Sequence, residues 1–333
     1  MLMDQEFDFI AIGDITTDAF IKLKEAKVNC DSNKENCQLC LTFGDKVPYE
    51  SVTIVPAVGN SPNAAVAAAR LGLKSAVVTD VGNDPEGKQA IGELERNGVD
   101  TRFVKINDNK KTNYHYVLWY GAERTILIKH EEFEYILPTL NSPRWIYLSS
   151  LGENSLDFHH DLALWLKNNP TTKLAFQPGT FQISLGAEKL PDIFSLTEIF
   201  FCNLEEARRI LKIDKEEDIK VLLSGIRSLG PKIVVLTDGP RGAYTYDGVE
   251  IWQMPIYPDP KPPISRTGAG DSFASTFTCM IAQGLSIPEA LKRAPINSMS
   301  VVQQVGAQAG LLTKDQLETF LASAPTDYEP KRI

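Results

Sequence analysis

Short apolar runs alternate with helical patterns along most of the chain. The run FDFIAIG at 7–13 ends in glycine and is typical of a buried strand, and SAVVTDV at 75–81 is of the same kind. The Ala-rich stretch NAAVAAARLG at 63–72 also ends in glycine, as helices do at a C-cap. The stretch 85–97 predicts a second helix, with proline in its first turn and Gly98 just past its end.

The same alternation continues toward the C-terminus. Strands alternating with helices predict a mostly parallel sheet that is covered by helices. Further strands are predicted at 145–149, 173–176, 199–202 and 232–237, and further helices at 203–211, 216–229, 270–283 and within 288–305.

Two regions, 22–55 and 101–130, break this rhythm. The first has no helical period, and the second contains the extended runs YHYVLWY at 114–120 and TILIK at 125–129. Extended segments inserted between βα units favour a small separate sheet, which can serve as a flap over a cleft. We therefore expect a main α/β domain and a small β-sheet lid. The main domain would comprise 1–21, 56–100 and 131–320, the lid 22–55 and 101–130, and the C-terminal tail 321–333.

Composition and charge exclude several classes of protein. The 333 residues include 34 basic and 43 acidic side chains, a net charge of −9, which argues against a broad nucleic-acid surface. No segment has the roughly 18 uncharged apolar residues of a membrane span. Acidic residues near the N-terminus do not fit a signal peptide, so we expect a cytoplasmic protein without a membrane or nucleic-acid partner.

The segment ISRTGAGDSFAST at 264–276 carries the most chemistry. It is a loop followed by a helix, and the small residues Gly268, Ala269 and Gly270 would let an anion approach the backbone amides at the helix start. Asp271 lies at the mouth of this cradle. An acid at this place is either a helix cap or a general base that takes a hydroxyl proton while the amides hold a phosphate.

At this point the sequence resembles a known family. TGAGDSF at 267–273 looks like the C-terminal signature of the ribokinase-like (PfkB) carbohydrate kinases, and GNSPNA at 59–64 with ARLG at 69–72 looks like their N-terminal signature. VGND at 81–84 is similar to the segment that follows it. NLEE at 203–206 resembles the N-x-x-E motif of the family, and TDGPRG at 237–242 its nucleotide-contacting turn. These segments stand in family order, so the resemblance covers nearly the whole chain.

The resemblance implies a three-layer α/β/α ribokinase-like fold and a kinase that transfers the γ-phosphate of ATP to a hydroxyl of a small sugar or sugar derivative. Asp271 would be the general base, and the amides of Gly268, Ala269 and Gly270 the anion hole. The remaining roles follow the same motifs: the acceptor would be bound by Asp18, Gly59, Asn60 and Asn63, the nucleotide by Asn203, Thr237, Gly239 and Gly242, and Mg²⁺ by Asn203 and Glu206.

Some alternatives stay open on the sequence. A nucleoside could replace the sugar as acceptor, and a non-catalytic sugar- or nucleotide-binding regulator is a third reading. The pair Asn203 and Glu206 also fits a plain helix cap. Relatives carry an acid that helps bind a monovalent cation where this chain has Ser265, which leaves K⁺ activation open; Arg266 beside it either approaches the phosphates or lies in solvent. In this family the lid often also pairs subunits, which implies a homodimer.

The five cysteines form an odd number, which does not fit a secreted disulfide framework. Cys30, Cys37 and Cys40 have half of a zinc signature, with no histidine nearby. We favour free thiols on the lid and keep a Zn²⁺ site at these three residues as the less favoured reading.

Overall fold

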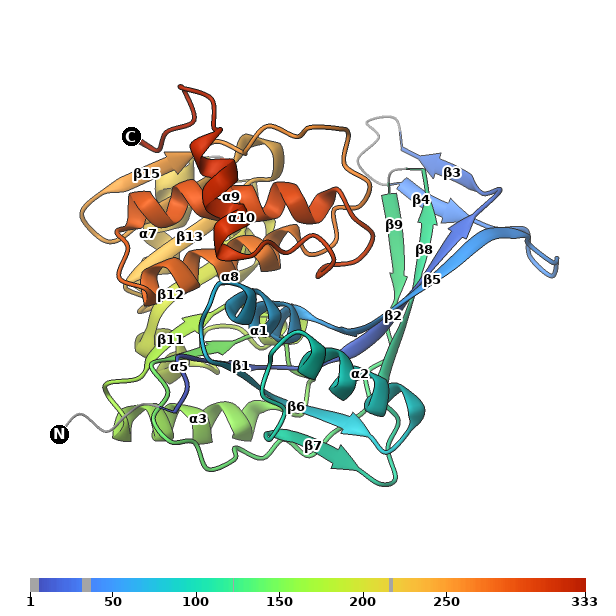
Figure 1. Cartoon of the computed structure of the whole chain (residues 1–333), viewed down its shortest axis with the longest axis horizontal. Helices are drawn as coiled ribbons and strands as arrows, with labels where there is room; N and C mark the ends of the chain where they lie inside the picture. Colours follow the sequence, from blue (N-terminus) through green and yellow to red (C-terminus); the bar gives the residue numbers. More distant parts are fainter. Residues whose placement is uncertain (1–5, 32–36, 122, 216–217) are drawn as a thin grey trace.

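The computed structural model describes residues 6–31, 37–121, 123–215 and 218–333, and within them a long twisted sheet forms the centre of the molecule (Figure 1). Its order is β16-β15-β14-β13-β12-β11-β10-β1-β6-β7, parallel from β13 to β7 and antiparallel from β13 to β16. The strands are β1 (Phe9–Ile12), β6 (Ser75–Gly82), β7 (Val104–Asn107), β10 (Trp145–Leu148), β11 (Lys173–Phe176), β12 (Thr197–Asn203), β13 (Ile233–Thr237), β14 (Ala243–Tyr246), β15 (Ile251–Met254) and β16 (Lys331–Arg332).

Helices cover both faces of this sheet, as the alternating pattern predicts. One layer packs on side chains such as Phe9 and Ala11 of β1, and the other on Ile10 and Ile12, which point the opposite way. The first layer contains α1 (Asn60–Arg70), α2 (Pro85–Arg96), α8 (Ala269–Ala282), α9 (Ile287–Val302) and α10 (Lys314–Ala322). The second contains α3 (Leu156–Asn168), α4 (Thr180–Leu185), α5 (Pro191–Leu196), α6 (Leu204–Leu211) and α7 (Ile219–Ser228); a short 3₁₀ turn, η1 (Gly239–Arg241), follows β13.

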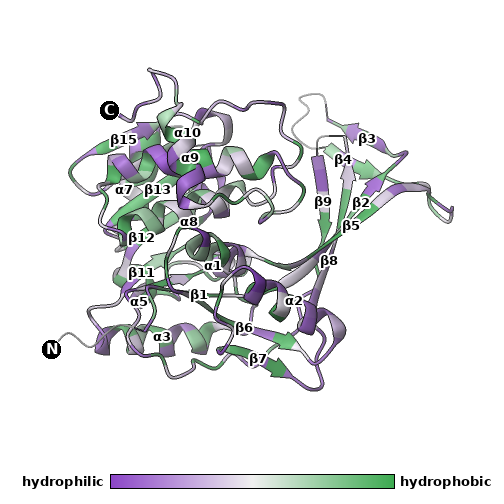
Figure 2. Ribbon diagram, in the orientation of Figure 1, coloured by the Kyte–Doolittle hydropathy of each residue, from purple (hydrophilic) through white to green (hydrophobic). Residues whose placement is uncertain are grey.

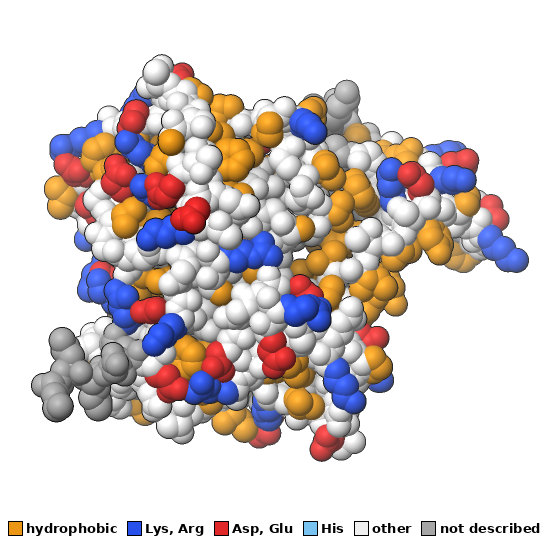
Figure 3. All heavy atoms as spheres, in the orientation of Figure 1, with side chains coloured by type: hydrophobic (Ala, Val, Ile, Leu, Met, Phe, Trp, Pro, Cys, Tyr) orange, Lys and Arg blue, Asp and Glu red, His pale blue; other side chains and the backbone are white. Residues whose placement is uncertain are grey.

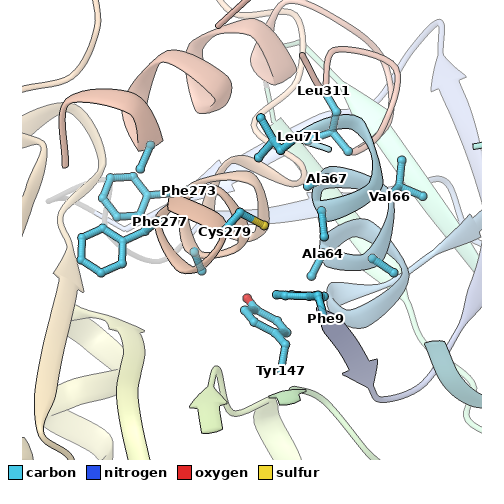
Figure 4. Close-up of a cluster of buried hydrophobic side chains, with 14 of the residues drawn as sticks. Phe9, Ala64, Val66, Ala67, Leu71, Tyr147, Phe273, Phe277, Cys279 and Leu311 are labelled. Carbon is cyan, nitrogen blue, oxygen red and sulfur yellow. The ribbon is translucent and has the colours of Figure 1, made fainter. Parts of the chain in front are cut away.

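Close packing of α1 against α8 fixes the geometry of the first layer. Figure 4 shows Ala64 and Ala67 of α1 beside Cys279 of α8, above Phe9 and Tyr147 of the sheet. The small alanine side chains let the two helix backbones approach each other closely, and each of these five residues is buried. The N-termini of both helices are thereby held at one edge of the sheet.

The lid projects from the main body as a second sheet of order β5-β2-β8-β9 (Figure 1). Its strands are β2 (Thr16–Leu23), β5 (Tyr49–Val58), β8 (Asn113–Tyr120) and β9 (Glu123–Leu127), and a separate hairpin joins β3 (Lys27–Cys30) to β4 (Cys37–Cys40). Figure 2 shows mixed polar and apolar residues along the lid, in contrast to the apolar strands of the central sheet.

Strand register separates the lid into two faces. Asp18 lies opposite His115, Phe20 opposite Val117, and Arg124 opposite Trp119, so these six residues share one face, here called the inner face. Phe20 and Val117 are buried, and the inner-face residue Val55 lies against Gly306 of the main domain. The outer face carries the exposed apolar residues Val52, Ile54, Tyr116 and Leu127.

The boundaries between lid and main domain differ from those expected. The lid sheet begins at Thr16, six residues before the expected boundary, because β2 continues directly from β1 with only a short bend. Strand β7 pairs with β6, which places 104–107 in the main sheet and not in the lid. The expected tail returns to the main sheet, where Arg332 of β16 pairs with Trp252 of β15.

The cysteine cluster is not a set of free thiols or zinc ligands. Cys30 and Cys37 lie opposite each other in the β3–β4 ladder and form a disulfide, whereas Cys40 is free. Two sulfurs bonded to each other cannot serve as thiolate ligands, so the zinc alternative for these three residues is wrong. Among the described residues, no helix is both long and apolar enough to cross a membrane.

Candidate active site

The carboxyl ends of the parallel strands meet at one edge of the sheet. The chain adds β6 and β7 on one side of β1, then crosses back to add β10 on the other side. Such a switch point opens a crevice beyond the strand ends, where α/β proteins bind ligands. Asp14, Gln177, Asn203 and Thr237 all follow or end strands at this edge.

The segment Gly268-Ala269-Gly270, here called the GAG segment, forms the start of α8 at this crevice. Gly268 is the N-cap with φ 81°, a left-handed conformation, and a Cβ there would stand 2.4 Å from the Cβ of Ala307. A Cβ on Gly270 would meet nothing within 4 Å, so this side of the helix start is open. Amides in the first helical turn lack carbonyl partners within the helix and lie at the positive end of its dipole. The start of α8 at Gly270 is therefore an open surface at the positive end of the helix dipole.

Asp271 is held by three side-chain amides beside that surface. Asn60 Nδ2 donates to Oδ1 at 2.9 Å, Asn63 Nδ2 to Oδ2 at 2.8 Å, and Gln177 Nε2 to Oδ1 at 3.1 Å. Gln308 in turn donates to the Oδ1 of Asn63 at 3.0 Å, which fixes the orientation of that amide. Neutral donors on both oxygens orient the carboxylate without neutralising it.

Burial governs the protonation of this carboxyl. Desolvation raises the pKa of Asp271 above its ordinary value, although hydrogen bonds from Asn63, Gln177 and Asn60 and the charge of Arg124 oppose the rise. A carboxylate with a raised pKa is a stronger base than an exposed aspartate. The residue is not fully buried, since its overall exposure lies between buried and exposed.

The start of α1 brings Asn60 and Asn63 to this place. Gly59 is the N-cap of α1 with φ 125°, and a Cβ there would stand 2.6 Å from the carbonyl oxygen of Asp14. Only glycine allows the two backbones to approach so closely. Of the four residues predicted to bind the acceptor, Gly59, Asn60 and Asn63 thus lie together with Asp271.

Asp18, the fourth, lies on the inner face of the lid in a group of acids and histidines that the sequence did not reveal. Its carboxylate is 3.4 Å from His115 Nδ1, and Asp14 is 3.4 Å from His130 Nδ1. Tyr135 donates from its hydroxyl to Asp14 at 2.9 Å. The histidine rings lie 5.4 Å apart. This group of residues connects the end of β1 to the lid. It lines the inner face of the lid with side chains that can donate or accept hydrogen bonds.

A cavity of about 400 Å³ lies on the other side of the α8 N-terminus. Three of the residues predicted to bind the nucleotide, Thr237, Gly239 and Gly242, line it, and so do Ala269 and Gly270. Gly242 has φ 95°, and a Cβ there would overlap the carbonyl of Met254, so glycine is required. Arg266 also lines the cavity, and most of the remaining wall is apolar: Pro240, Ile256, Tyr257, Pro263, Phe273, Pro295, Met299 and Val302.

Asn203 and Glu206 form a reciprocal capping box at the start of α6. Asn203 Oδ1 accepts from the Glu206 amide at 2.9 Å, and Glu206 Oε2 accepts from the Asn203 amide at 2.9 Å. Asn203 pairs with Thr237 in the sheet, which places the box next to the cavity. Burial raises the pKa of Glu206. The capping interpretation is confirmed. The other carboxylate oxygen of Glu206, Oε1, takes no part in the capping box.

The comparisons with known proteins identify the family. The family model for the pfkB family of carbohydrate kinases matches residues 22–314. The chain belongs to this family. It is therefore an enzyme, a phosphotransferase with an alcohol group as acceptor. It is 26% identical to the ribokinase of Bacillus subtilis over 294 residues, which covers 84% of this chain and 92% of that protein.

Two further relatives extend the comparison. A nucleoside kinase of Methanothermobacter thermautotrophicus is 26% identical over 293 residues, covering 82% of this chain and 86% of that protein. The structure of Arabidopsis thaliana ribokinase complexed with ribose and ATP superposes with a TM-score of 0.79 at 18% identity, covering 95% of this chain and 98% of that one. This likeness confirms the three-layer α/β/α ribokinase-like fold predicted from the sequence.

The two glycines of the α8 start give a stability prediction. Gly268→Ala should lower the free energy of unfolding by about 1–3 kcal/mol, because it combines a left-handed φ with overlap on Ala307. Gly270→Ala should leave stability unchanged or raise it slightly, since alanine favours a helix and nothing lies in its way. Urea denaturation of both variants measures the difference; equal destabilisation would contradict the geometry at Gly268.

Proposed function

We propose that this enzyme transfers the γ-phosphate of ATP to a hydroxyl of a small sugar or sugar derivative, with Asp271 as the general base. The observation that carries the proposal is the placement of a desolvated carboxylate, oriented by three amides, beside the positive N-terminus of α8. An acceptor hydroxyl seated between them would lose its proton to Asp271 as its oxygen attacks the phosphorus. Asn60 and Asn63 would keep the carboxylate aimed at that hydroxyl.

The amides of Gly268, Ala269 and Gly270 would bind the charge on the transferring phosphoryl group. Phosphoryl transfer depends mainly on positioning and charge stabilisation, which backbone amides at a helix start supply. The open surface at Gly270 supports this role, because a phosphate oxygen can approach there without meeting a side chain. Each such donor is worth up to about 3 kcal/mol of transition-state stabilisation in other enzymes.

The cavity lined by Thr237, Gly239 and Gly242 would hold the nucleotide, with its apolar wall against the base. Asn203 and Glu206 fit Mg²⁺ by their donor chemistry, since both offer oxygen atoms at the neighbouring strand end. No group of three or more acidic, histidine or cysteine side chains in the described ranges could hold a metal ion. Mg²⁺ would screen the charge of the phosphates, and these two residues would position its water ligands.

The acceptor would lie between Asp271 and the inner face of the lid. Asp14, Asp18 and the two histidines offer acceptors and donors for several hydroxyl groups, which suits a sugar. A nucleoside is the second candidate. It is favoured by the nucleoside kinase relative and by Phe181, whose ring packs edge-on against His130 at 5.4 Å and could contact a base.

The lid also supports a homodimer. The apolar residues of the outer face, Val52, Ile54, Tyr116 and Leu127, are between 44% and 54% exposed and lie in adjacent strands. Figure 3 shows hydrophobic side chains along the lid, between the main body and its tip. A second lid packed on this face would remove them from water.

Removing the base is the direct test of the proposal. Asp271→Asn should lower kcat by about 10²–10⁴-fold or more, because the hydroxyl proton has no acceptor, while ATP still binds. The measurement is ATP consumption with ribose, fructose, 2-keto-3-deoxygluconate, hexose phosphates and nucleosides, with ATP affinity by calorimetry. Full activity of the variant would exclude Asp271 as the base, and no turnover of any acceptor by the unaltered enzyme would refute the kinase proposal.

The pKa of Asp271 gives a pH prediction. The base must be ionised, so kcat/KM should fall as pH drops through a pKa above that of an ordinary aspartate. Gln177→Leu removes a hydrogen bond that stabilises the charged form, so the pKa of Asp271 should rise further and the acidic limb should move to higher pH. Gln253→Leu, which removes a hydrogen bond to Tyr244, is the control. If the acidic limb of Gln177→Leu coincides with that of the unaltered enzyme, the pH dependence does not report the ionisation of Asp271.

Glu206→Gln tests the magnesium role. Glutamine keeps an oxygen that can accept from the Asn203 amide, so the cap and the fold should survive, but the negative charge is lost. The Mg²⁺ concentration for half-maximal activity should rise several-fold in a titration at saturating ATP. Glu205→Gln, an exposed neighbour in the same turn, is the matched control. An unchanged titration would leave Glu206 as a cap only.

A further inference from the structure

Arg124 is a cation on the inner face of the lid that the reaction described above does not use. It lies in β9 opposite Trp119, on the face that also carries Asp18 and His115. With Phe20, Trp119 and Glu123 it borders a small gap, and Ile264, Ser265 and Val305 of the main domain line the other side. Arg124 therefore points from the lid toward the segment that leads into the GAG cradle.

The guanidinium of Arg124 has no partner in this position. It makes no hydrogen bond and no ion pair with any of the described residues. Burial lowers its pKa, whereas the charges of Glu123, Asp18 and Asp271 raise it and that of Arg266 lowers it. A half-buried guanidinium with five unused donors is costly unless an anion or water satisfies it.

Two of the three carboxylates that act on Arg124 face other groups, and the third, the exposed Glu123, is its neighbour in the strand. Asp271 accepts hydrogen bonds from Asn60, Asn63 and Gln177, and Asp18 faces His115. By contrast, Lys22 on the same face of the lid is satisfied, since it pairs with Glu50 at 2.8 Å. Of the inner-face residues Lys22 and Arg124, Arg124 is therefore the one whose hydrogen-bond donors are available for a ligand.

The position of Arg124 favours the acceptor over the nucleotide. Arg266 lines the nucleotide cavity, but Arg124 does not. Among the charges that act on Arg124, two belong to Asp18 and Asp271, the carboxylates proposed to face the acceptor. Asp14, Asp18 and Asp271 would all repel the negative charge of an anionic acceptor. Such an acceptor could therefore bind there only with a cation such as Arg124 beside it.

We propose that Arg124 selects an acceptor that carries an oxyanion, a carboxylate or a phosphate, on the part of the sugar remote from the reacting hydroxyl. This inference rests on the proposed kinase function and narrows its substrate class. The planar fork of the guanidinium matches both oxyanions through two parallel hydrogen bonds. The lid would then close on the charged end of the acceptor and hold the hydroxyl at Asp271.

The test compares acceptors that differ in this charge. With the unaltered enzyme, kcat/KM for 2-keto-3-deoxygluconate or for fructose 6-phosphate should exceed that for fructose and ribose; which of the two anions is preferred separates a carboxylate from a phosphate. Arg124→Met should lower kcat/KM for the preferred anion by about 10–100-fold, mainly through KM, as expected for one charged hydrogen-bonding contact. Values for neutral sugars should stay within about threefold.

Controls exclude a general effect on the lid. Lys22→Met removes a cation from the same face and should leave the preference unchanged. Arg124→Lys should recover part of the preference, since it keeps the charge without the planar fork. Urea denaturation of each variant checks that the lid is folded.

Three outcomes would overturn the inference. An equal loss for neutral and anionic acceptors, or a raised KM for ATP, would assign Arg124 to the donor phosphates. A neutral sugar or a nucleoside as the best acceptor, unaffected by Arg124→Met, would refute an anionic acceptor but leave the kinase proposal intact. If no acceptor is phosphorylated, calorimetry with the two anions in the absence of ATP still decides: binding that is equal in Arg124→Met and unaltered protein, or absent from both, refutes the role of Arg124.

Discussion

The proposed base role requires a charged carboxylate in a desolvated place, and this requirement is the constraint on which the site depends. Amides that reach both oxygens of Asp271 stabilise its charged form, and they come from residues 211, 208 and 94 positions away in the sequence. The parallel sheet supplies Gln177 at the end of β11, and the packing of α1 on α8 supplies Asn60 and Asn63. The alanine-rich face of α1 is thus part of the chemistry, because bulkier side chains would move the amides away from the carboxylate.

In the proposed function, the lid and the main sheet together surround the acceptor. Asp14 follows β1, and Asp18 lies four residues later in β2, so one short segment passes from the floor of the crevice to its cover. The histidines that face these acids come from β8 and from the segment after β9. A movement of the lid would therefore change hydrogen bonds on the acceptor side, while the amides that hold Asp271 belong to the main domain and would stay in place.

Local signals in the sequence predicted the parallel strands and the main helices and drew attention to Asp271, whereas Asn60 was predicted from the resemblance to the family. They did not predict Gln177 or Gln308, because a single glutamine after a strand or in a loop has no pattern, and only the tertiary contacts show its partner. The disulfide was also missed: thiol spacing alone does not show that Cys30 and Cys37 face each other across a hairpin. β7 was assigned to the lid because an edge strand has the same extended pattern in either sheet.

The kind of donor around Asp271 matters as much as the number. A cation in direct contact would stabilise the carboxylate more strongly than an amide, but it would lower the pKa and so weaken the base. The structure keeps Arg124 without a direct bond to Asp271 and uses neutral amides for the contacts themselves, and burial then raises the pKa. Orientation and basicity are in this way controlled by different groups. A more distant guanidinium can hold a charged ligand in the same crevice without neutralising the carboxylate proposed to accept the proton.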